Sequence, residues 1–159
     1  MTTEELFPDD MTLGEARLLL VKLAEKGVEC PACFQFAKIY RRPVNSSMAR
    51  GLIATYRAFG REFGYLQDVR RANGETDNRE ESKLRYWGLL EEEPTRRPDG
   101  GRAGWWRVTQ HGEQWIRGEV VIPKYAEIYN GECLGLIGEP TTIRQALGKK
   151  FDLAELMDS

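Results

Sequence analysis

Cysteine and histidine are the residues of this 159-residue chain with the most specific chemistry, and the chain has three cysteines and one histidine. Cys30 and Cys33 form a Cys-x-x-Cys pair, whose two thiolates supply half of a tetrahedral zinc site. Cys133, His111 and carboxylates are the groups available to complete such a site. Three interpretations stay open: a zinc site or its degenerate remnant, a redox pair, and two free thiols at a tight turn. A redox pair would be expected near a βαβ unit, which the surrounding sequence does not provide.

Motifs for catalysis are missing from the sequence. It contains no phosphate-binding glycine-rich loop, no HExxH pattern and no nucleophile elbow. His111 stands at the start of an expected helix, where a surface position is typical, and Asp9 and Asp10 belong to an acidic N-terminal segment. We therefore predict neither an enzyme nor a small-molecule substrate.

Charge is unevenly distributed along the chain, although the formal net charge at pH 7 is only −2. Residues 34–73 and 94–111 are rich in arginine, whereas residues 1–33 and 74–93 are mainly acidic. The whole chain is not a polycation, but the two basic segments would form one basic face if the fold brings them together. Such a face would suit the phosphates of a nucleic acid.

The elements that would hold the second basic segment are the clearest in the sequence. Residues 78–87 have a helical periodicity that Gly88 ends, residues 89–92 alternate as a strand, and residues 105–108 form its partner. The loop between the strands, 94–104, contains Pro-Asp-Gly-Gly, which is typical of a turn. These segments predict a β-hairpin with an arginine-bearing loop directly after a helix.

Another helix should follow the hairpin. The Thr109 hydroxyl can cap its first turn, and Trp115 and Ile116 lie on its expected buried side. In the strand before it, Trp105 and Trp106 are adjacent and must point to opposite faces of the sheet, so one should be core and the other partly exposed. An exposed tryptophan beside arginines suits a protein interface or stacking on a base, and packing against the C-terminal segment is the simpler alternative.

The order of helix, strand, basic loop, strand and Thr-x-x-Gly (Thr109 to Gly112) resembles the winged-helix regulators of the multiple-antibiotic-resistance and PadR types. This resemblance covers the segment from Lys83 to Gly118. It implies an α+β fold with a winged helix-turn-helix core. An N-terminal amphipathic helix, the Cys-x-x-Cys turn and a C-terminal β-hairpin plus short helix would flank that core. A helix, a hairpin and a helix in another fold would give the same pattern.

Over most of its length the chain is also similar to small uncharacterised proteins of bacteriophage and prophage genomes. The similarity rests on KLRYWGLLEE, GGRAGWWRVT, VIPKYAEIYNGE and the upstream Cys-x-x-Cys. In those proteins the cysteine turn often resembles a fuller zinc knuckle with glycine after the second cysteine, whereas Phe34 follows Cys33 here. The family brings no biochemical role with it.

The flanking elements follow from caps and turn residues. Thr12 and Glu15 have capping-box spacing before an amphipathic helix over residues 13–26, which we expect to pack on the core. Asn130-Gly131 is a strong signal for a two-residue hairpin turn. Further elements are expected as a strand over 34–40, a helix over 47–59, a short element over 63–69, a short helix over 142–147 and a final helical turn over 151–157.

We divide the chain into an N-terminal helix and cysteine element (1–44), a winged-helix core (45–118) and a C-terminal hairpin and helix (119–159), packed as one unit. No apolar run approaches the ~20 residues that span a bilayer, and the N-terminus is acidic where a signal peptide would be basic. Three cysteines do not make a disulfide framework. We expect a cytoplasmic protein with no membrane partner.

Two functions fit these features. The first is a phage-type DNA-binding protein, for example a transcriptional regulator, that grips duplex DNA mainly through its wing. The second is a protein-binding winged helix that captures a host defence or transcription component, which Glu80 and Glu81 favour because they would repel phosphate. A homodimer through the first helix is open in either case. The first function predicts DNA contacts from Arg79, Lys83, Arg96, Arg97 and Arg102, with Arg41, Arg42, Arg50 and Arg57 on phosphates.

Overall fold

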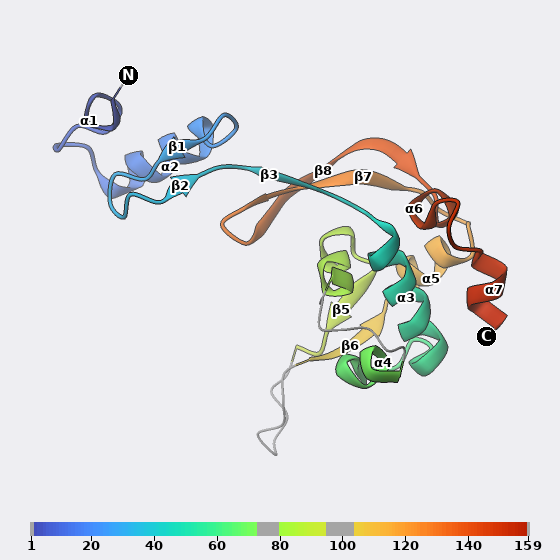
Figure 1. The fold of residues 1–159 in the computed structure, drawn as a ribbon. Helices are drawn as coiled ribbons and strands as arrows, with labels where there is room; N and C mark the ends of the chain where they lie inside the picture. Colours follow the sequence, from blue (N-terminus) through green and yellow to red (C-terminus); the bar gives the residue numbers. More distant parts are fainter. Residues whose placement is uncertain (1, 73–79, 95–103, 159) are drawn as a thin grey trace, which may run out of the picture. The chain divides into compact units, whose positions relative to one another are not determined.

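Residues 2–72, 80–94 and 104–158 are described by the structure, a computed structural model drawn in Figure 1. Helices and antiparallel sheets are mixed, which confirms the α+β fold class. The chain divides into two compact units. Unit 1 contains Met1–Arg42 and Ala126–Gly135, and unit 2 contains Pro43–Tyr125 and Leu136–Ser159.

This division differs from the three segments expected from the sequence. The first predicted boundary, after residue 44, nearly coincides with the start of unit 2 at Pro43. The C-terminal hairpin, however, is not a segment of its own. Its strands β7 (Ile122–Tyr129) and β8 (Glu132–Thr141) are eight and ten residues long, and the end of the hairpin around the turn, Ala126–Gly135, groups with unit 1. A hairpin of that length contributes residues to both units, which a linear reading of the chain does not anticipate.

Helix α3 (Ser46–Phe59) is the central helix of unit 2. It begins at Asn45, whose Oδ1 accepts a hydrogen bond from the Met48 backbone N–H at 2.9 Å. Met48, Leu52 and Ile53 then recur on one side and are buried, as their helical spacing predicts. The remaining helices that pack on α3 are α4 (Leu66–Ala72), the 3₁₀ helix η1 (Glu80–Trp87), α5 (Gln110–Ile116), α6 (Ile143–Leu147) and α7 (Leu153–Asp158).

A three-stranded sheet completes the core of unit 2. Its strands are β4 (Gly64–Tyr65), β5 (Leu90–Glu92) and β6 (Trp105–Val108), in the order β4-β6-β5. Both pairings are antiparallel, with Gly64 opposite Trp106 on one side of β6 and Leu90 opposite Val108 on the other. The strand β4, which falls inside the short element expected over 63–69, therefore pairs with the second strand of the predicted hairpin.

The helix after this sheet begins where the sequence predicts. Thr109 is the N-cap of α5, and its Oγ1 accepts a hydrogen bond from the Gly112 backbone N–H at 3.0 Å. Trp115 and Ile116 are both buried, and the Trp115 indole donates to the Thr141 carbonyl at 3.0 Å. Helix α5 thus connects the sheet to the C-terminal residues of the same unit.

A second three-stranded sheet has the order β3-β7-β8. The boundary between the two units falls within each of its strands. Strand β3 is Tyr40–Pro43. The β7-β8 turn has Asn130 at φ 51° and Gly131 at φ 77°, which confirms the predicted two-residue hairpin turn with positive φ at both central positions. The short helix α6 begins at Thr142 through a capping box with Gln145, also as the sequence predicts.

Unit 1 departs most from expectation. It contains α1 (Thr3–Leu6), α2 (Leu13–Leu23) and a hairpin of β1 (Val28–Glu29) with β2 (Phe36–Ala37). The Thr12–Glu15 capping box is present, but α2 ends three residues before the predicted residue 26. The strand expected over 34–40 is also wrong: Phe34 has φ 64°, and β2 and β3 are separate strands.

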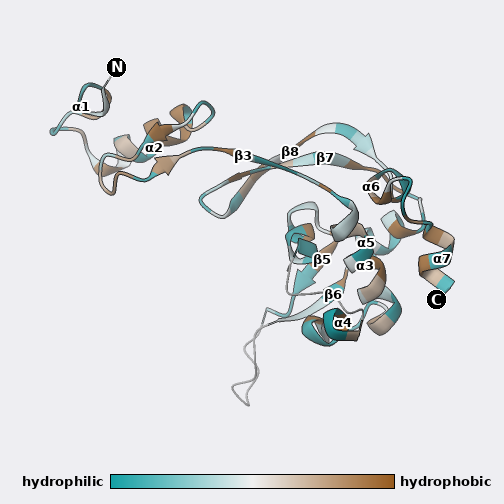
Figure 2. Ribbon diagram, viewed as in Figure 1, coloured by the Kyte–Doolittle hydropathy of each residue, from teal (hydrophilic) through white to brown (hydrophobic). Residues whose placement is uncertain are grey.

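The expectation that α2 packs on the core is not met either, because α2 contains no buried residue. Figure 2 shows strongly hydrophobic residues along this helix. Leu13, Leu18 and Val21 are 62%, 70% and 41% exposed. The β1-β2 hairpin has only two residues in each strand, so it is too small to cover an apolar helix face.

Candidate nucleic-acid interface

The helix η1 presents its side chains in three rows because a 3₁₀ helix has about three residues per turn. Glu81, Leu84 and Trp87 recur every third residue and are all buried. The sequence predicts an α-helix here, and over eight residues its apolar pattern cannot distinguish a period of three from one of 3.6. The outward rows, of which Arg85 is the most exposed, consist of Glu80, Ser82, Lys83, Arg85 and Tyr86.

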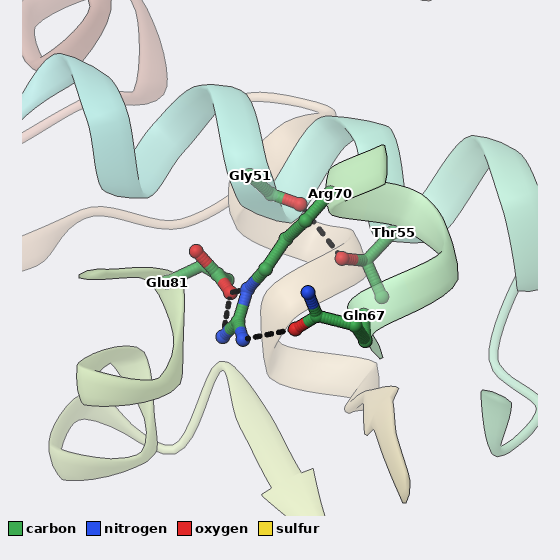
Figure 3. A network of polar contacts seen from close by, with 5 residues as sticks. All are labelled: Gly51, Thr55, Gln67, Arg70 and Glu81. Atoms are coloured by element: carbon green, nitrogen blue, oxygen red, sulfur yellow. Dashed lines mark hydrogen bonds and ion pairs between the residues drawn. The ribbon is translucent and has the colours of Figure 1, made fainter. Parts of the chain in front are cut away.

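Glu81 is buried inside unit 2 rather than displayed on its surface. It is 2% exposed, and its Oε1 accepts a hydrogen bond from Nε of Arg70 on α4 and forms an ion pair with Nη2 of the same side chain, which is 12% exposed. Figure 3 shows the two side chains pointing toward each other, with Gln67 beside the guanidinium. Gln67 Oε1 accepts a further hydrogen bond from Arg70 Nη1 at 3.4 Å. The negative charge of Glu81 is therefore balanced within the fold, and it does not face a phosphate as the sequence suggested.

Gly51 lets η1 approach α3 closely enough to bury that carboxylate. A Cβ atom at position 51 would lie 2.7 Å from the Glu81 Cβ, a separation that real side chains do not tolerate. One turn further along α3, the Thr55 hydroxyl donates to the Gly51 carbonyl at 2.7 Å, so this buried hydroxyl is satisfied within its own helix. A glycine in the middle of a helix was the sequence signal for this close approach, and it was missed.

Two of the predicted phosphate contacts, Arg50 and Arg57, line a small pocket next to the same ion pair. The pocket has a volume of about 100 Å³ and is bounded by α3, α4, η1 and α7. The Arg50 guanidinium lies 4.4 Å from the centre of the Phe151 ring, so this side chain packs on an aromatic face within unit 2. Arg57 is exposed at the end of α3. The fold brings Arg50, Arg57 and Arg70 together, which the sequence did not predict for Arg70.

The other predicted contacts are distributed over the chain. Lys83 is half-buried on η1 in unit 2. Arg41 and Arg42 are exposed on β3 in unit 1, and Arg41 Nε lies 3.8 Å from the Glu127 carboxylate. The remaining four predicted contacts lie outside the residues that the structure describes: Arg79, Arg96, Arg97 and Arg102.

The tryptophan pair on β6 confirms the expected alternation. Trp106 is buried at 6% exposure, whereas Trp105 is half-exposed on the opposite face. The Trp105 and Tyr65 ring centroids are 6.1 Å apart, with the rings inclined by 31°. A second pocket, of about 280 Å³, lies between α4, η1 and the sheet and is lined by Tyr65, Leu66, Gln67, Arg70, Ser82, Glu92, Gly104 and Trp106. Tyr65 lines this pocket and was not among the predicted contacts.

Several cations of unit 2 are engaged by carboxylates. Arg107 pairs with Glu91 across the β5-β6 ladder and also lies 4.6 Å from the centre of the Phe63 ring. Arg117 lies within 3.8 Å of Glu113, and a hydrogen bond to the Tyr56 hydroxyl together with this carboxylate raises the pKa of Arg117. These cations are partly compensated and offer less to a phosphate than their number in the sequence suggests.

The remaining candidates are the metal ligands. Cys30 and Cys33 lie at the β1-β2 turn of unit 1, and His111 is exposed on α5 of unit 2. Among the described residues, no three histidine, cysteine or acidic side chains come together in a group that could hold a metal ion. Among the described residues of one chain, Cys30 and Cys33 therefore have no further side chains that would complete a four-ligand zinc site.

Comparison with protein-family models, with curated proteins and with solved structures gave no match for this chain. None of the helices in residues 2–72, 80–94 and 104–158 is both long enough and apolar enough to cross a membrane.

Proposed function

We propose that unit 2 is a winged helix that binds duplex DNA. The order of its elements, α3, β4, α4, η1, β5 and β6, supports this proposal, as does the β4-β6-β5 sheet. In this interpretation η1 takes the place of the recognition helix, and the loop between β5 and β6 is the wing. The protein would act in the cytoplasm, in an infected host cell if a phage encodes it.

The observation that carries the proposal is the burial of Glu81 against Arg70. An exposed carboxylate at this position would repel phosphate, and it was one of the reasons to consider a protein partner, beside the near-neutral net charge and the aromatic hairpin. With Glu81 removed from the surface, Lys83, Arg85 and Tyr86 dominate the outward rows of η1, and Glu80 is the one acid left on the helix. Such side chains suit contacts with phosphates and base edges.

The grip on the DNA backbone would come mainly from the proposed wing. Arg107 at its base is already paired with Glu91, so Arg96, Arg97 and Arg102 in the loop are the cations best suited to phosphates. Basic loops of this kind reach the minor groove or the backbone beside a helix in the major groove. Affinity should therefore fall steeply with salt and depend weakly on DNA sequence.

Fluorescence anisotropy of a labelled duplex at several salt concentrations tests this proposal. For Arg96→Ala/Arg97→Ala, we expect weaker binding to every duplex and a slope of log affinity against log salt that is shallower by about 1.8, since each phosphate contact contributes about 0.9. The matched control is Lys149→Ala/Lys150→Ala, which removes the same charge from exposed residues after α6.

Two results would overturn the proposal. One is a wild-type protein that does not bind duplex DNA at low salt. The other is an equal loss of affinity in the control and the wing variant, because the effect would then report total charge rather than a defined contact. The first result would favour the alternative function, in which unit 2 binds a protein.

A further inference from the structure

Backbone hydrogen bonds hold the turn that carries Cys30 and Cys33. It closes the β1-β2 hairpin, in which Val28 is opposite Ala37. The Phe34 backbone N–H donates to the Cys30 carbonyl at 2.9 Å, and the Cys30 N–H donates to the Gln35 carbonyl at 2.8 Å. These two bonds hold both cysteines on one tight turn.

The backbone conformation of Phe34 shows that the hydrogen bonds of this turn constrain the chain. Its φ of 64° lies in the left-handed region that favours glycine, and its ring is 73% exposed. A bulky residue with no burial to compensate it adopts this conformation only where the surrounding hydrogen bonds require it. The turn thus has the conformation that a glycine after the second cysteine would adopt most easily.

The same turn stabilises a thiolate. Hydrogen bonds from the backbone N–H groups of Cys33 and Ala32 to the Cys30 sulfur lower the pKa of Cys30 below the ordinary value of a cysteine thiol. Cys33 is exposed, and both thiols are free.

The described residues of one chain supply two ligands at this place, Cys30 and Cys33. Cys133 belongs to the same unit, but its thiol donates to the Gly135 carbonyl at 3.5 Å, and no third metal-binding side chain joins the pair among the described residues. Zinc in a closed structural site requires four ligands in a tetrahedron. The described part of the chain does not supply the other two ligands, and a second copy can supply them.

The surroundings of the pair fit a second copy of the same surface. A pocket of about 500 Å³ in unit 1 is lined by both cysteines together with apolar and basic side chains. Phe34, Phe36 and Tyr40 are 73%, 61% and 56% exposed, which is more apolar surface than isolated exposed residues would explain. Arg17 and Lys38 also line the pocket and would offset the double negative charge of a zinc ion bound by four thiolates.

We propose that two copies of the chain bind one zinc ion between them, each through Cys30 and Cys33. The four thiolates complete the tetrahedron, and any thiol still protonated releases its proton to solvent as the metal binds. No oxidant or reductant takes part. The interface has twofold symmetry, since each copy contributes the same two ligands and the same apolar side chains. This bridge is independent of the DNA binding proposed for unit 2.

The experiment measures mass and metal content together on the full-length protein. Reduced, metal-free protein is titrated with zinc chloride and followed by size-exclusion chromatography with light scattering, and the peak is analysed for zinc. We expect a doubling of mass with one zinc for every two chains, reversed by EDTA. Cys30→Ser/Cys33→Ser should stay at the monomer mass without zinc, whereas the control Cys133→Ser should behave like the wild type.

Three outcomes would overturn the bridge: one zinc per monomer, no zinc retained above the level of the double variant, or loss of the zinc-bound dimer in Cys133→Ser. A mass that doubles only without reductant, and without zinc, would indicate a disulfide instead. Reversal by EDTA is measured on the wild type, so the test does not depend on the double variant folding. Far-UV circular dichroism of each variant checks its fold.

Discussion

Helices α2 in unit 1 and α3 in unit 2 look alike in the sequence and behave differently in the structure. Each begins at a side-chain N-cap, carries apolar residues at helical spacing and contains one glycine. Helix α3 buries Met48, Leu52 and Ile53 among the other elements of unit 2, whereas α2 buries none of its residues. The difference shows that a helical pattern of apolar residues predicts a helix, but not whether other elements of the fold pack against its apolar side. The elements packed around α3 also contain the buried ion pair of Glu81 with Arg70, so unit 2 has a well-defined core.

The largest expected effect concerns that ion pair. Glu81→Ala leaves Arg70 buried without its partner, and breaking a buried pair in this way costs about 3–5 kcal/mol in the free energy of unfolding. Urea denaturation measures the loss. Glu62→Ala, at an exposed position of the same unit, is the control and should change stability by less than about 0.5 kcal/mol. If the two variants lost the same stability, the buried ion pair would not contribute specifically to the core of unit 2.

A matched pair of leucines compares the two helices directly. Leu52 on α3 has no exposed surface, so Leu52→Ala should cost about 2–5 kcal/mol through lost burial and a cavity. Leu18 on α2 is 70% exposed and does not line the cysteine pocket, so Leu18→Ala should stay within about 0.5 kcal/mol. Urea denaturation of the metal-free protein measures both. A loss of several kcal/mol at Leu18 would mean that α2 is covered after all.

The two helix glycines should respond with opposite signs. At Gly51 a new Cβ would collide with Glu81, and overpacking of this kind costs about 1–3 kcal/mol. At Gly14 the nearest atom to a new Cβ is the Thr12 Oγ1 at 4.0 Å, so alanine should add up to about 1 kcal/mol by restricting the unfolded chain and favouring the helix. Thermal unfolding distinguishes the two. A stabilising Gly51→Ala would show that α3 and η1 are not in close contact.

The smallest expected effect concerns the reactivity of the Cys30 thiol in unit 1. Because its pKa is lowered in the fold, Cys30 should carry more thiolate near neutral pH than it does in the unfolded chain. Its alkylation by iodoacetamide in metal-free protein should therefore begin at a lower pH than in urea-unfolded protein, as read from the labelled peptide by mass spectrometry. An onset at the same pH in both states would show that the turn amides do not stabilise the thiolate.

Features that depend on neighbouring residues were determined by the sequence alone. The caps at Thr12, Asn45, Thr109 and Thr142 each involve a hydrogen bond to a residue three positions away, and the Asn130-Gly131 turn depends on two adjacent residues. Such bonds form within one turn of the chain, so the residue types place the caps at Thr12 and Thr109 and the hairpin turn. For the other two caps they leave two neighbouring candidates each, Asn45 or Ser46 and Thr141 or Thr142. The opposite faces of the tryptophan pair followed from the alternation of a strand, whereas the α+β class was expected from the resemblance to winged-helix proteins.

Only the tertiary structure decided where charge and apolar surface end up. Arg70 and Glu81 are eleven residues apart and meet because Gly51 admits η1 against α3, which changes an expected obstacle to DNA binding into part of the core. The sequence could not show that α2 buries none of its residues, nor that the Cys30–Cys33 turn gathers no third ligand among the described residues, since both depend on which elements lie nearby. The physical reason is that burial and ion pairing are set by non-local packing, whereas the sequence pattern records only which side chains are available to pack.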